Sequence, residues 1–418
     1  MKIGFIGLGK LGLPVALAIN AKGHEVMGYD LNPAVKGYLS ERAIPFKEEG
    51  IEPLLETHTV QMTDDIRNVV DWADIVFIAV QTPHEPRFEG ATRLPEDRAD
   101  FDYAYLTEAV AEVSKWCLYY KKHTTVVVIS TCLPGTYNRR IKNLLNEYVH
   151  YVYNPFFIAM GTVVHDFLNP EFVLLGGEWD RKRLIWSQKP WDKIDDFYRT
   201  IHDKKLFPTD ITTAEGIKVF YNTFITMKTV LANTYGEMAH KLGMNVDDIY
   251  AALSLATDRI ISPKYLKAGM GDGGGCHPRD NIALSDTAKR VGLSHNIFED
   301  PMKAREDHAE WLASLIIEAS VKHKIYDIAI LGRAFKPETN IETGSPAVLV
   351  ANILREKGIE FTHEEDVEFP NKPYVIFLGT QHARYFAGYN YPAQSVVIDP
   401  FGELPESEDI TVVRIGRP

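Results

Sequence analysis

The chain has 418 residues, of which 45% are hydrophobic and 24% charged, and neither glycine (29) nor proline (23) is in excess. This composition excludes a disordered, collagen-like or coiled-coil protein, and at about 150 residues per domain the length predicts two or three domains. The 57 acidic residues outnumber the 45 Lys and Arg, and the net charge of -12 argues against nucleic acid or an anionic membrane as a partner. Any anionic ligand must therefore meet a local positive site.

We expect a cytoplasmic protein. The longest apolar stretch is interrupted by Lys10 and falls short of the roughly 20 residues that a membrane span needs. The first residues run directly into a strand pattern, which leaves no room for a signal peptide. The three cysteines, Cys117, Cys132 and Cys276, are too few for a disulfide framework and suit a reducing compartment.

Short apolar runs alternate with helical patterns in the first part of the chain. Apolar strand patterns cover residues 2–7, 24–30, 73–80 and 124–130, and a helical pattern covers 13–21. This alternation predicts an α/β fold, in which a doubly wound parallel sheet is covered by crossover helices on both faces.

A long helix is predicted for residues 212–243. Thr212 or Thr213 could cap it, Glu215 would lie in its first turn, and Gly243 would end it. A helix of about 30 residues, well above the average of about 11 to 12, commonly joins domains.

An α/β pattern returns after residue 320 and repeats the start of the chain. Residues 326–332 parallel the first strand, 346–357 parallel the first helix, and 359–361 parallel the second strand, but the glycine fingerprint is absent. The chain is thus expected to contain two Rossmann-like halves joined by a long central helix. We interpret the acidic residues 364–368 as a solvated loop or strand edge.

A dinucleotide site is predicted at the first turn. Gly7, Gly9 and Gly12 form a G-x-G-x-x-G that follows a strand and opens a helix, so a pyrophosphate could approach the backbone at the helix N-terminus. Asp30 ends the second strand, where a carboxylate can bind ribose hydroxyls and repel a 2′-phosphate. The sequence therefore favours NAD over NADP.

A reactive thiol is predicted at Cys276. It follows the glycine-rich residues 269–275 and precedes Pro278, where a helix could begin, and both the helix dipole and Arg279 would favour the thiolate. Asp280 lies four residues further on, on the same face of such a helix, where it could steer a water or accept a proton. Cys117 and Cys132 are expected to be small buried residues.

Two further groups are candidates for the site. Lys218 and Asn222 are four residues apart on the long helix and could together stabilise an oxyanion. A surface pair of Glu215 and Lys218 is an equally good interpretation of the same spacing. Thr131 follows a strand at the carboxyl edge of the sheet, where ligands bind in such folds. The histidines and cysteines lack metal-ligand spacing, so no metal site is expected.

With these motifs in place, the chain resembles the nucleotide-sugar 6-dehydrogenases over nearly its whole length. The segments that carry the resemblance are 7–14 (GLGKLGLP), 73–83 (ADIVFIAVQTP), 130–136 (STCLPGT), 214–222 (AEGIKVFYN), the cysteine loop 269–280 (GMGDGGGCHPRD) and 335–339 (FKPET). The resemblance implies an NAD-binding Rossmann-like domain (1–208), a central helical region that makes a homodimer and carries the cysteine loop (209–300), and a Rossmann-like nucleotide-sugar domain (301–418).

The family oxidises a C6 primary alcohol to a carboxylate with two NAD, through a thiohemiacetal and a thioester. The resemblance implies that Cys276 is the nucleophile, that Lys218 and Asn222 hold the oxyanion, and that Asp280 and Thr131 place the hydrolytic water. It further implies that NAD contacts Gly7, Gly9, Leu11, Gly12, Asp30, Thr82, Thr131 and Arg279. A UDP-sugar would contact Arg259, Tyr265, Leu266, Lys267, Gly269 and Lys336.

The chain departs from the family at two places. Residues 154–161 read NPFFIAMG where the family has NPEFLREG, so Phe156 and Met160 replace glutamates, the second of which serves base chemistry. Asp280 and water could cover that step, a carboxylate from elsewhere could take it over, or thioester hydrolysis could be slow. At the second place Thr343 replaces an arginine that contacts cofactor or substrate.

The leading hypothesis is a UDP-glucose 6-dehydrogenase. Alternatives are oxidation of a UDP-N-acetylhexosamine or of GDP-mannose, a two-electron dehydrogenase prompted by Met160, and a nucleotide-sugar-binding protein with little turnover. Residues 12–14 favour an N-acetylhexosamine, whereas residues 265–269 favour UDP-glucose.

Overall fold

The computed structural model describes residues 1–83, 85, 99–180, 185–186, 191–262, 268–274, 277–337, 339 and 341–415. These residues form two compact units, Met1–Thr226 and Met227–Pro418. The three-domain division drawn from the sequence remains a prediction.

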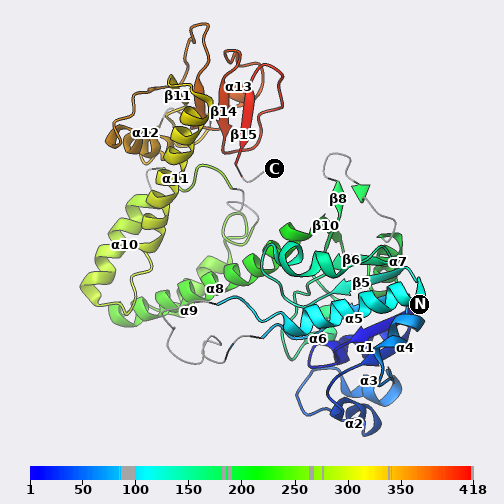
Figure 1. Ribbon diagram of the computed structural model, residues 1–418. Coiled ribbons are helices and arrows are strands. Elements are labelled where there is room, and N and C mark those ends of the chain that lie inside the picture. The colour runs from blue at the N-terminus through cyan, green and yellow to red at the C-terminus, as the bar shows by residue number, and fades with distance from the viewer. Residues whose placement is uncertain are drawn as a thin grey trace. The chain divides into compact units, whose positions relative to one another are not determined.

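An eight-stranded sheet forms the centre of the first unit (Figure 1), with the strand order β10-β7-β6-β5-β4-β1-β2-β3. Neighbouring strands pair in parallel except β6 with β7. The strands are β1 (Lys2–Ile6), β2 (Glu25–Tyr29), β3 (Gln61–Met62), β4 (Ile75–Ile78), β5 (Thr124–Val128), β6 (Val149–Tyr153), β7 (Val173–Gly177) and β10 (Leu206–Asp210), with a separate pair β8 (Trp179–Asp180) and β9 (Ile185–Trp186).

Helices cover both faces of this sheet. Apolar residues of α1 (Gly12–Ala21), α6 (Val163–Leu168) and α7 (Trp191–Ile201) bury one face, and those of α4 (Ile66–Trp72) and α5 (Ala104–Tyr120) bury the other. Within β1, Ile3 and Phe5 belong to the first cluster and Ile6 to the second, as the alternation of side chains in a strand requires. The predicted doubly wound sheet is confirmed. The remaining short helices are α2 (Ala34–Ser40) and α3 (Glu52–Thr57).

The predicted long helix is α8 (Ile211–Leu242), with 32 residues, and Gly243 follows it at φ 69° (Figure 1). Its cap differs from the prediction. Asp210 accepts hydrogen bonds from the backbone N–H and the hydroxyl of Thr213, at 2.9 and 2.8 Å. Because β10 ends at Asp210, the strand passes into the helix without a loop, and this places the carboxylate rather than a threonine at the cap.

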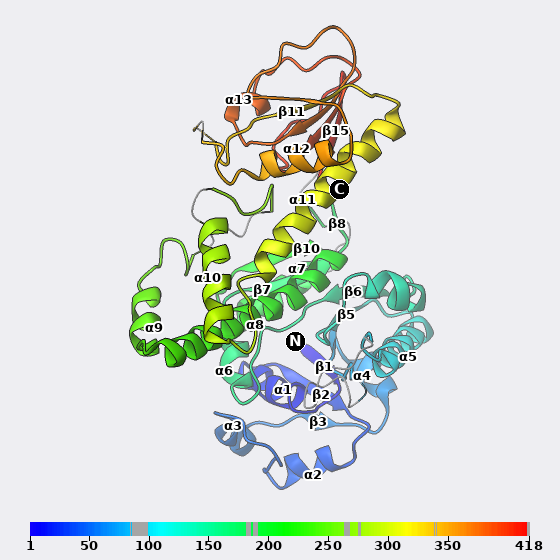
Figure 2. The same cartoon turned by 90° about the vertical axis from the view of Figure 1, so that its left-hand side faces the viewer.

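The second unit contains a five-stranded parallel sheet in the order β12-β11-β13-β14-β15. Helices α11 (Asp300–His323) and α12 (Pro346–Glu356) bury one face together, as Figure 2 shows. The strands are β11 (Ile328–Leu331), β12 (Thr362–Glu364), β13 (Val375–Leu378), β14 (Val396–Asp399) and β15 (Thr411–Arg414), and the other helices are α9 (Val246–Ser254), α10 (His277–Val291) and α13 (Ala383–Phe386).

The second half thus repeats the strand–helix–strand order of the first, as predicted. Its second strand lies at Thr362–Glu364 rather than at residues 359–361. Ile359 and Phe361 pack instead against the apolar cluster under α11 and α12, which explains why their apolar character suggested a strand.

Candidate active site

The glycine turn after β1 has the geometry that a dinucleotide needs. Gly7 has φ 93°, and a Cβ on Gly12 would lie 2.2 Å from the carbonyl oxygen of Gly7, so neither position accepts a side chain. A Cβ on Gly9 would meet nothing within 4 Å, which leaves open space in front of the backbone. Leu11 immediately precedes α1. The turn therefore keeps the start of α1 accessible to a pyrophosphate.

Asp30 faces the same turn. Its Oδ2 accepts a hydrogen bond of 2.6 Å from the N–H of Leu8, and its Oδ1 accepts one of 2.7 Å from the N–H of Asn32. A carboxylate has about four acceptor sites, so two remain for ribose hydroxyls. The residues of this turn fit the predicted NAD, and Gly7, Gly9, Gly12 and Asp30 would hold it.

The loops after β4 and β5 are joined by side-chain hydrogen bonds. Thr82 donates to the carbonyl oxygen of Thr131 at 3.0 Å, and Ser130 donates to that of Val80 at 2.6 Å. Because β1, β4 and β5 are parallel neighbours, these loops lie at the same edge of the sheet as the glycine turn. The predicted residues Thr82 and Thr131 are thus brought to one edge with Gly7 and Asp30.

Glu215 connects α8 to that edge. Its side chain is fully buried, and its two carboxylate oxygens accept hydrogen bonds from the N–H groups of Gly135 and Tyr137, at 2.6 and 2.7 Å. Burial raises the pKa of Glu215, and the two backbone hydrogen bonds partly oppose this. The alternative of a Glu215–Lys218 surface pair is therefore wrong.

Lys218 is buried with 9% of its surface exposed. Its Nζ donates a 2.8 Å hydrogen bond to the carbonyl oxygen of Phe156 and lies 5.1 Å from the centre of the Phe157 ring. Among the residues that the structure describes, no carboxylate pairs with Lys218, and desolvation lowers its pKa. Asn222, one turn further along α8, is exposed. A buried ammonium with two donors to spare suits the stabilisation of a nearby oxyanion.

The segment that departs from the family lies beside Lys218. The ring of Phe156 packs against that of Phe167 at 5.6 Å, and Met160 is 65% exposed, so neither side chain can transfer a proton. Sequence reasoning missed two carboxylates here. Glu48 accepts hydrogen bonds from the N–H groups of Gly161 and Val164 at 3.1 and 3.3 Å, and Asp166 accepts one of 2.9 Å from the N–H of Ala159. Through these hydrogen bonds both carboxylates hold the backbone of residues 159–164 in place.

Neither carboxylate carries a local sequence signal for this role. Glu48 lies more than 110 positions before its partners, and nothing in its neighbourhood indicates them. Asp166 could have been found as a residue in the first turn of α6, where a carboxylate can bind backbone N–H groups. Burial raises the pKa of Asp166, but hydrogen bonds from Ala159, His165 and Thr162 outweigh this and lower it overall.

The second unit holds the cysteine loop. Cys276 itself and Tyr265, Leu266 and Lys267 lie outside the described residues, as do the side chains of Arg279 and Asp280. Helix α10 begins at His277, one residue before the predicted start at Pro278. Gly269 is half-buried, and its carbonyl oxygen lies 3.3 Å from Nε2 of His308, while Arg259 is exposed.

The remaining predicted substrate residue, Lys336, is exposed on the loop after β11, with its Nζ 5.3 Å from the centre of the Phe335 ring. An ammonium at this edge can supply the local positive charge that the acidic composition requires.

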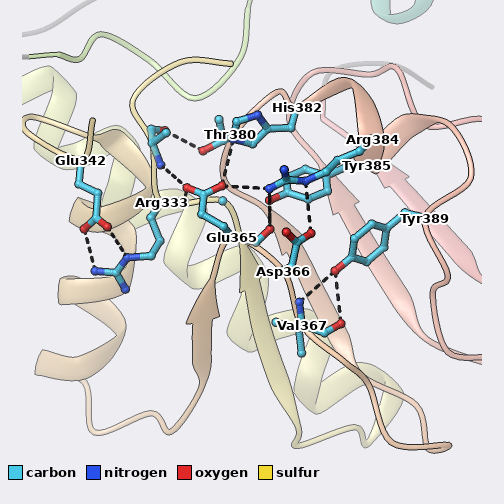
Figure 3. Close-up of polar contacts among 12 residues, drawn as sticks. Arg333, Glu342, Glu365, Asp366, Val367, Thr380, His382, Arg384, Tyr385 and Tyr389 are labelled. Carbon is cyan, nitrogen blue, oxygen red and sulfur yellow. Dashed lines mark hydrogen bonds and ion pairs between the residues drawn. The ribbon is translucent and has the colours of Figure 1, made fainter. Parts of the chain in front are cut away.

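A carboxylate network lies at the same edge of the second sheet (Figure 3). Oε1 of Glu365 accepts hydrogen bonds from the N–H groups of Arg333 and Ala334, at 2.8 and 3.0 Å, and Oε2 lies 3.0 Å from Nε2 of His382. Glu365 immediately follows β12, just as Asp30 immediately follows β2. Asp30 accepts a hydrogen bond from the residue after the turn glycine Gly7, and Glu365 accepts one from the residue after Gly332. The predicted strand edge is confirmed, since β12 is an edge strand, but Glu365 is structural rather than solvated.

The two other thiols lie in the core of the first unit. Cys117 and Cys132 are fully buried, as predicted, and burial raises the pKa of each. In the described part of the chain, no group of three or more His, Cys, Asp or Glu could hold a metal ion. Within the same residues, no helix is long and apolar enough to cross a membrane.

Two family models match the chain. The NAD-binding domain of the UDP-glucose/GDP-mannose dehydrogenase family matches residues 1–201, and the central domain of that family matches residues 212–306. A UDP-glucose 6-dehydrogenase of Rhizobium meliloti is 29% identical over 378 residues, which are 87% of this chain and 80% of that protein. A GDP-mannose 6-dehydrogenase of Pseudomonas aeruginosa is 27% identical over 429 residues, covering 100% and 92% of the two chains.

Solved structures show the same fold. A GDP-mannose dehydrogenase from Pseudomonas aeruginosa, crystallised as a ternary complex, superposes with a TM-score of 0.83 at 23% identity over 99% of both chains. A UDP-glucose dehydrogenase from Pyrobaculum islandicum gives 0.53 at 24% identity over 99% and 96%. Taken with the glycine turn and Asp30, these matches show that the chain belongs to the UDP-glucose/GDP-mannose dehydrogenase family, the nucleotide-sugar dehydrogenases whose N-terminal domain binds NAD.

Proposed function

We propose that this protein oxidises the C6 primary alcohol of a UDP-sugar, with UDP-glucose as the best candidate, to the carboxylate. The observation that carries the proposal is Lys218, a buried lysine without a described carboxylate partner beside residues 156–157. NAD, when bound, accepts one hydride in each of two oxidation steps. Residues 265–269 of the loop before Cys276 resemble UDP-glucose enzymes and support this substrate over an N-acetylhexosamine or GDP-mannose.

The proposed role of Cys276 follows from the chemistry. Loss of hydride and a proton from the alcohol gives an aldehyde, to which the Cys276 thiolate adds as a thiohemiacetal. Loss of a second hydride gives a thioester, and water releases the carboxylate and restores the thiol. Lys218 and Asn222 would bind the oxygen that becomes negative in the addition and hydrolysis steps. Thr131 and Asp280 would place the water.

The stoichiometry of NADH tests this function. We expect two NADH and one uronate per UDP-glucose, and Cys276→Ser should form no uronate while Cys117→Ala keeps the wild-type stoichiometry. UDP-N-acetylglucosamine, UDP-N-acetylmannosamine and GDP-mannose should be slower substrates. No uronate from any of these sugars would end the proposal.

The exposed Met160 favours a second candidate, a two-electron dehydrogenase. Without a carboxylate at positions 156 and 160, the step after the first hydride transfer has lost the base that the family uses. This enzyme would release one NADH per sugar together with an aldehyde, which a hydrazine reagent would trap. Two NADH per sugar would exclude it.

We further propose a homodimer. Exposed apolar side chains follow one side of α8, at Phe220 (67%), Phe224 (52%) and Met227 (51%), and α9 exposes Tyr250 (74%). Apolar surface on this scale marks an interface. Light scattering should give twice the 47.3 kDa of one chain. Tyr250→Asp should shift the mass toward the monomer, whereas Leu118→Asp, at a position of α5 that is 49% exposed, should not.

A further inference from the structure

The glycine loop before Cys276 rests on the loop that opens α12. The N–H of Gly274 donates a 3.1 Å hydrogen bond to the carbonyl oxygen of Gly344. A Cβ on Gly344 would lie 2.2 Å from the carbonyl oxygen of Gly274, and a Cβ on Gly273 would lie 2.7 Å from Cδ of Pro346. The two backbones therefore touch, and only glycine fits at these contacts.

Arg305 of α11 bridges the two loops. Its Nε donates to the carbonyl oxygen of Asp272 at 2.9 Å, and its Nη2 donates to that of Gly344 at 3.1 Å. Within the described residues Arg305 forms no ion pair, so the N–H groups of its guanidinium donate to the two carbonyl oxygens. One side chain thus fixes the distance between the cysteine loop and the start of α12.

Two further contacts hold the same loop against the second unit. Met270 is buried in the apolar cluster that contains Leu312 and Val350. The ring of Phe335 lies directly under Gly274, since a Cβ there would be 2.8 Å from Cε2. The loop from 269 to 274 is therefore part of the packing of this unit.

The two halves of the chain differ at this position. In the first half, the helix that follows the first strand starts behind Gly9, which has open space in front of it. In the second half, the corresponding helix is α12. The space in front of its first residues is filled by the backbone of Gly273 and Gly274. The space beside residues 341–346, where Thr343 replaces the arginine of the family, is thus filled by the glycine loop.

We propose that Arg305 and Gly344 are positioning residues, which hold the loop that carries Cys276 in place for the second oxidation. The proposal rests on the proposed function, because it assigns Cys276 the role of nucleophile. A displacement of the loop by about 1 Å would reduce the rate of that step by about 10²-fold. Binding of the UDP-sugar would change much less than this rate, because neither Arg305 nor Gly344 is among the residues that the family resemblance implies as UDP-sugar contacts.

Two matched pairs of variants test the proposal. Gly344→Ala is compared with Gly358→Ala, because both glycines have a left-handed φ (68° and 70°) but a Cβ on Gly358 meets nothing within 4 Å. Arg305→Met is compared with Arg355→Met on α12, and Arg305→Lys tests for partial rescue. We expect both glycine variants to lose thermal stability from backbone strain, Gly344→Ala more than Gly358→Ala because its Cβ also meets the Gly274 carbonyl, and only Gly344→Ala to lose activity.

Hydrogen–deuterium exchange and kinetics are the two measurements. Exchange in the peptide covering 268–280 should rise in Gly344→Ala and Arg305→Met and stay unchanged in the two controls. In the same two variants kcat for uronate should fall by about 10²-fold with KM for the UDP-sugar within about threefold. Arg305→Lys should regain part of the lost kcat.

The outcomes separate the two proposals. Unchanged exchange in Arg305→Met would overturn the docking of the loop, and raised exchange with wild-type kcat would overturn the positioning role. A wild type that forms no uronate would instead remove the proposed function, and the exchange measurement would still decide whether Arg305 holds the loop.

Discussion

Lys218 donates its 2.8 Å hydrogen bond to the backbone carbonyl of Phe156, one of the two positions where the resemblance to the family implies a glutamate. The lysine therefore has a neutral partner in this chain, and its charge is not compensated by any described carboxylate. The uncompensated charge suits Lys218 to the proposed binding of an oxyanion. The same charge, buried without a counter-ion, lowers the stability of the folded state.

Lys218→Met should lower kcat by about 10²- to 10³-fold, because it removes a donor to the proposed oxyanion. It should not lower the thermal midpoint at pH 7, because a buried unpaired ammonium opposes folding. Desolvation lowers the folded-state pKa of Lys218, so the unfolded state binds more protons between the folded and unfolded pKa values. Wild-type stability should accordingly rise with pH through that window relative to Lys218→Met, measured by urea unfolding. A clearly less stable Lys218→Met would contradict this account.

Asp30→Ala should weaken the use of NAD and improve that of NADP. The carboxylate has acceptor sites left for ribose hydroxyls, and hydrogen bonds to charged groups contribute about 1.5–3 kcal/mol, so kcat/KM for NAD should fall by about tenfold or more. Asp30→Asn keeps an acceptor for the N–H of Leu8 and controls for damage to the turn. An unchanged ratio of kcat/KM for the two cofactors would show that Asp30 does not select between them.

Glu215→Gln should destabilise the first unit. Both carboxylate oxygens accept a backbone N–H, from Gly135 and Tyr137, and an amide can accept only one of the two. The lost bond in a buried site should cost about 1–3 kcal/mol in urea unfolding. Glu25→Gln, on an exposed side chain of β2, serves as the control and should be neutral.

Tyr151 and Tyr153 form a matched pair on β6. The hydroxyl of Tyr151 is buried without a hydrogen-bond partner among the described residues, whereas that of Tyr153 accepts a 3.1 Å bond from the N–H of Cys132. Tyr151→Phe should therefore leave the free energy of unfolding unchanged or raise it by about 1 kcal/mol, and Tyr153→Phe should lower it by about 1–3 kcal/mol. Equal effects of the two substitutions in calorimetry would refute this distinction.

Local patterns in the sequence predicted the elements well. The helical spacing of 212–243 located α8 to within one residue at each end, because apolar periodicity and a terminal glycine are both local signals. The second strand of the second half was placed three residues early, because Ile359 and Phe361 are apolar for packing rather than for pairing.

Long-range contacts could not be predicted in the same way. Glu215 is three residues from Lys218 but bonds residues 78 and 80 positions away, and spacing on a helix cannot reveal such partners. Glu48, Arg305 and Glu365 were missed for the same reason, since each binds backbone groups that carry no sequence signature. The roles of Cys276 and Asp280 stay predictions.

The direct passage from β10 into α8 restricts how this protein can vary. Asp210 pairs with Gly177 in the sheet and Ile211 is already helical, so the register of β10 against β7 sets the rotation of α8 about its axis. One residue inserted or deleted between Ile211 and Lys218 would turn the lysine by about 100° away from the Phe156 carbonyl. A substitution in this stretch leaves the lysine in its place on the helix, whereas a change in the length of the stretch would move its charge away from the site.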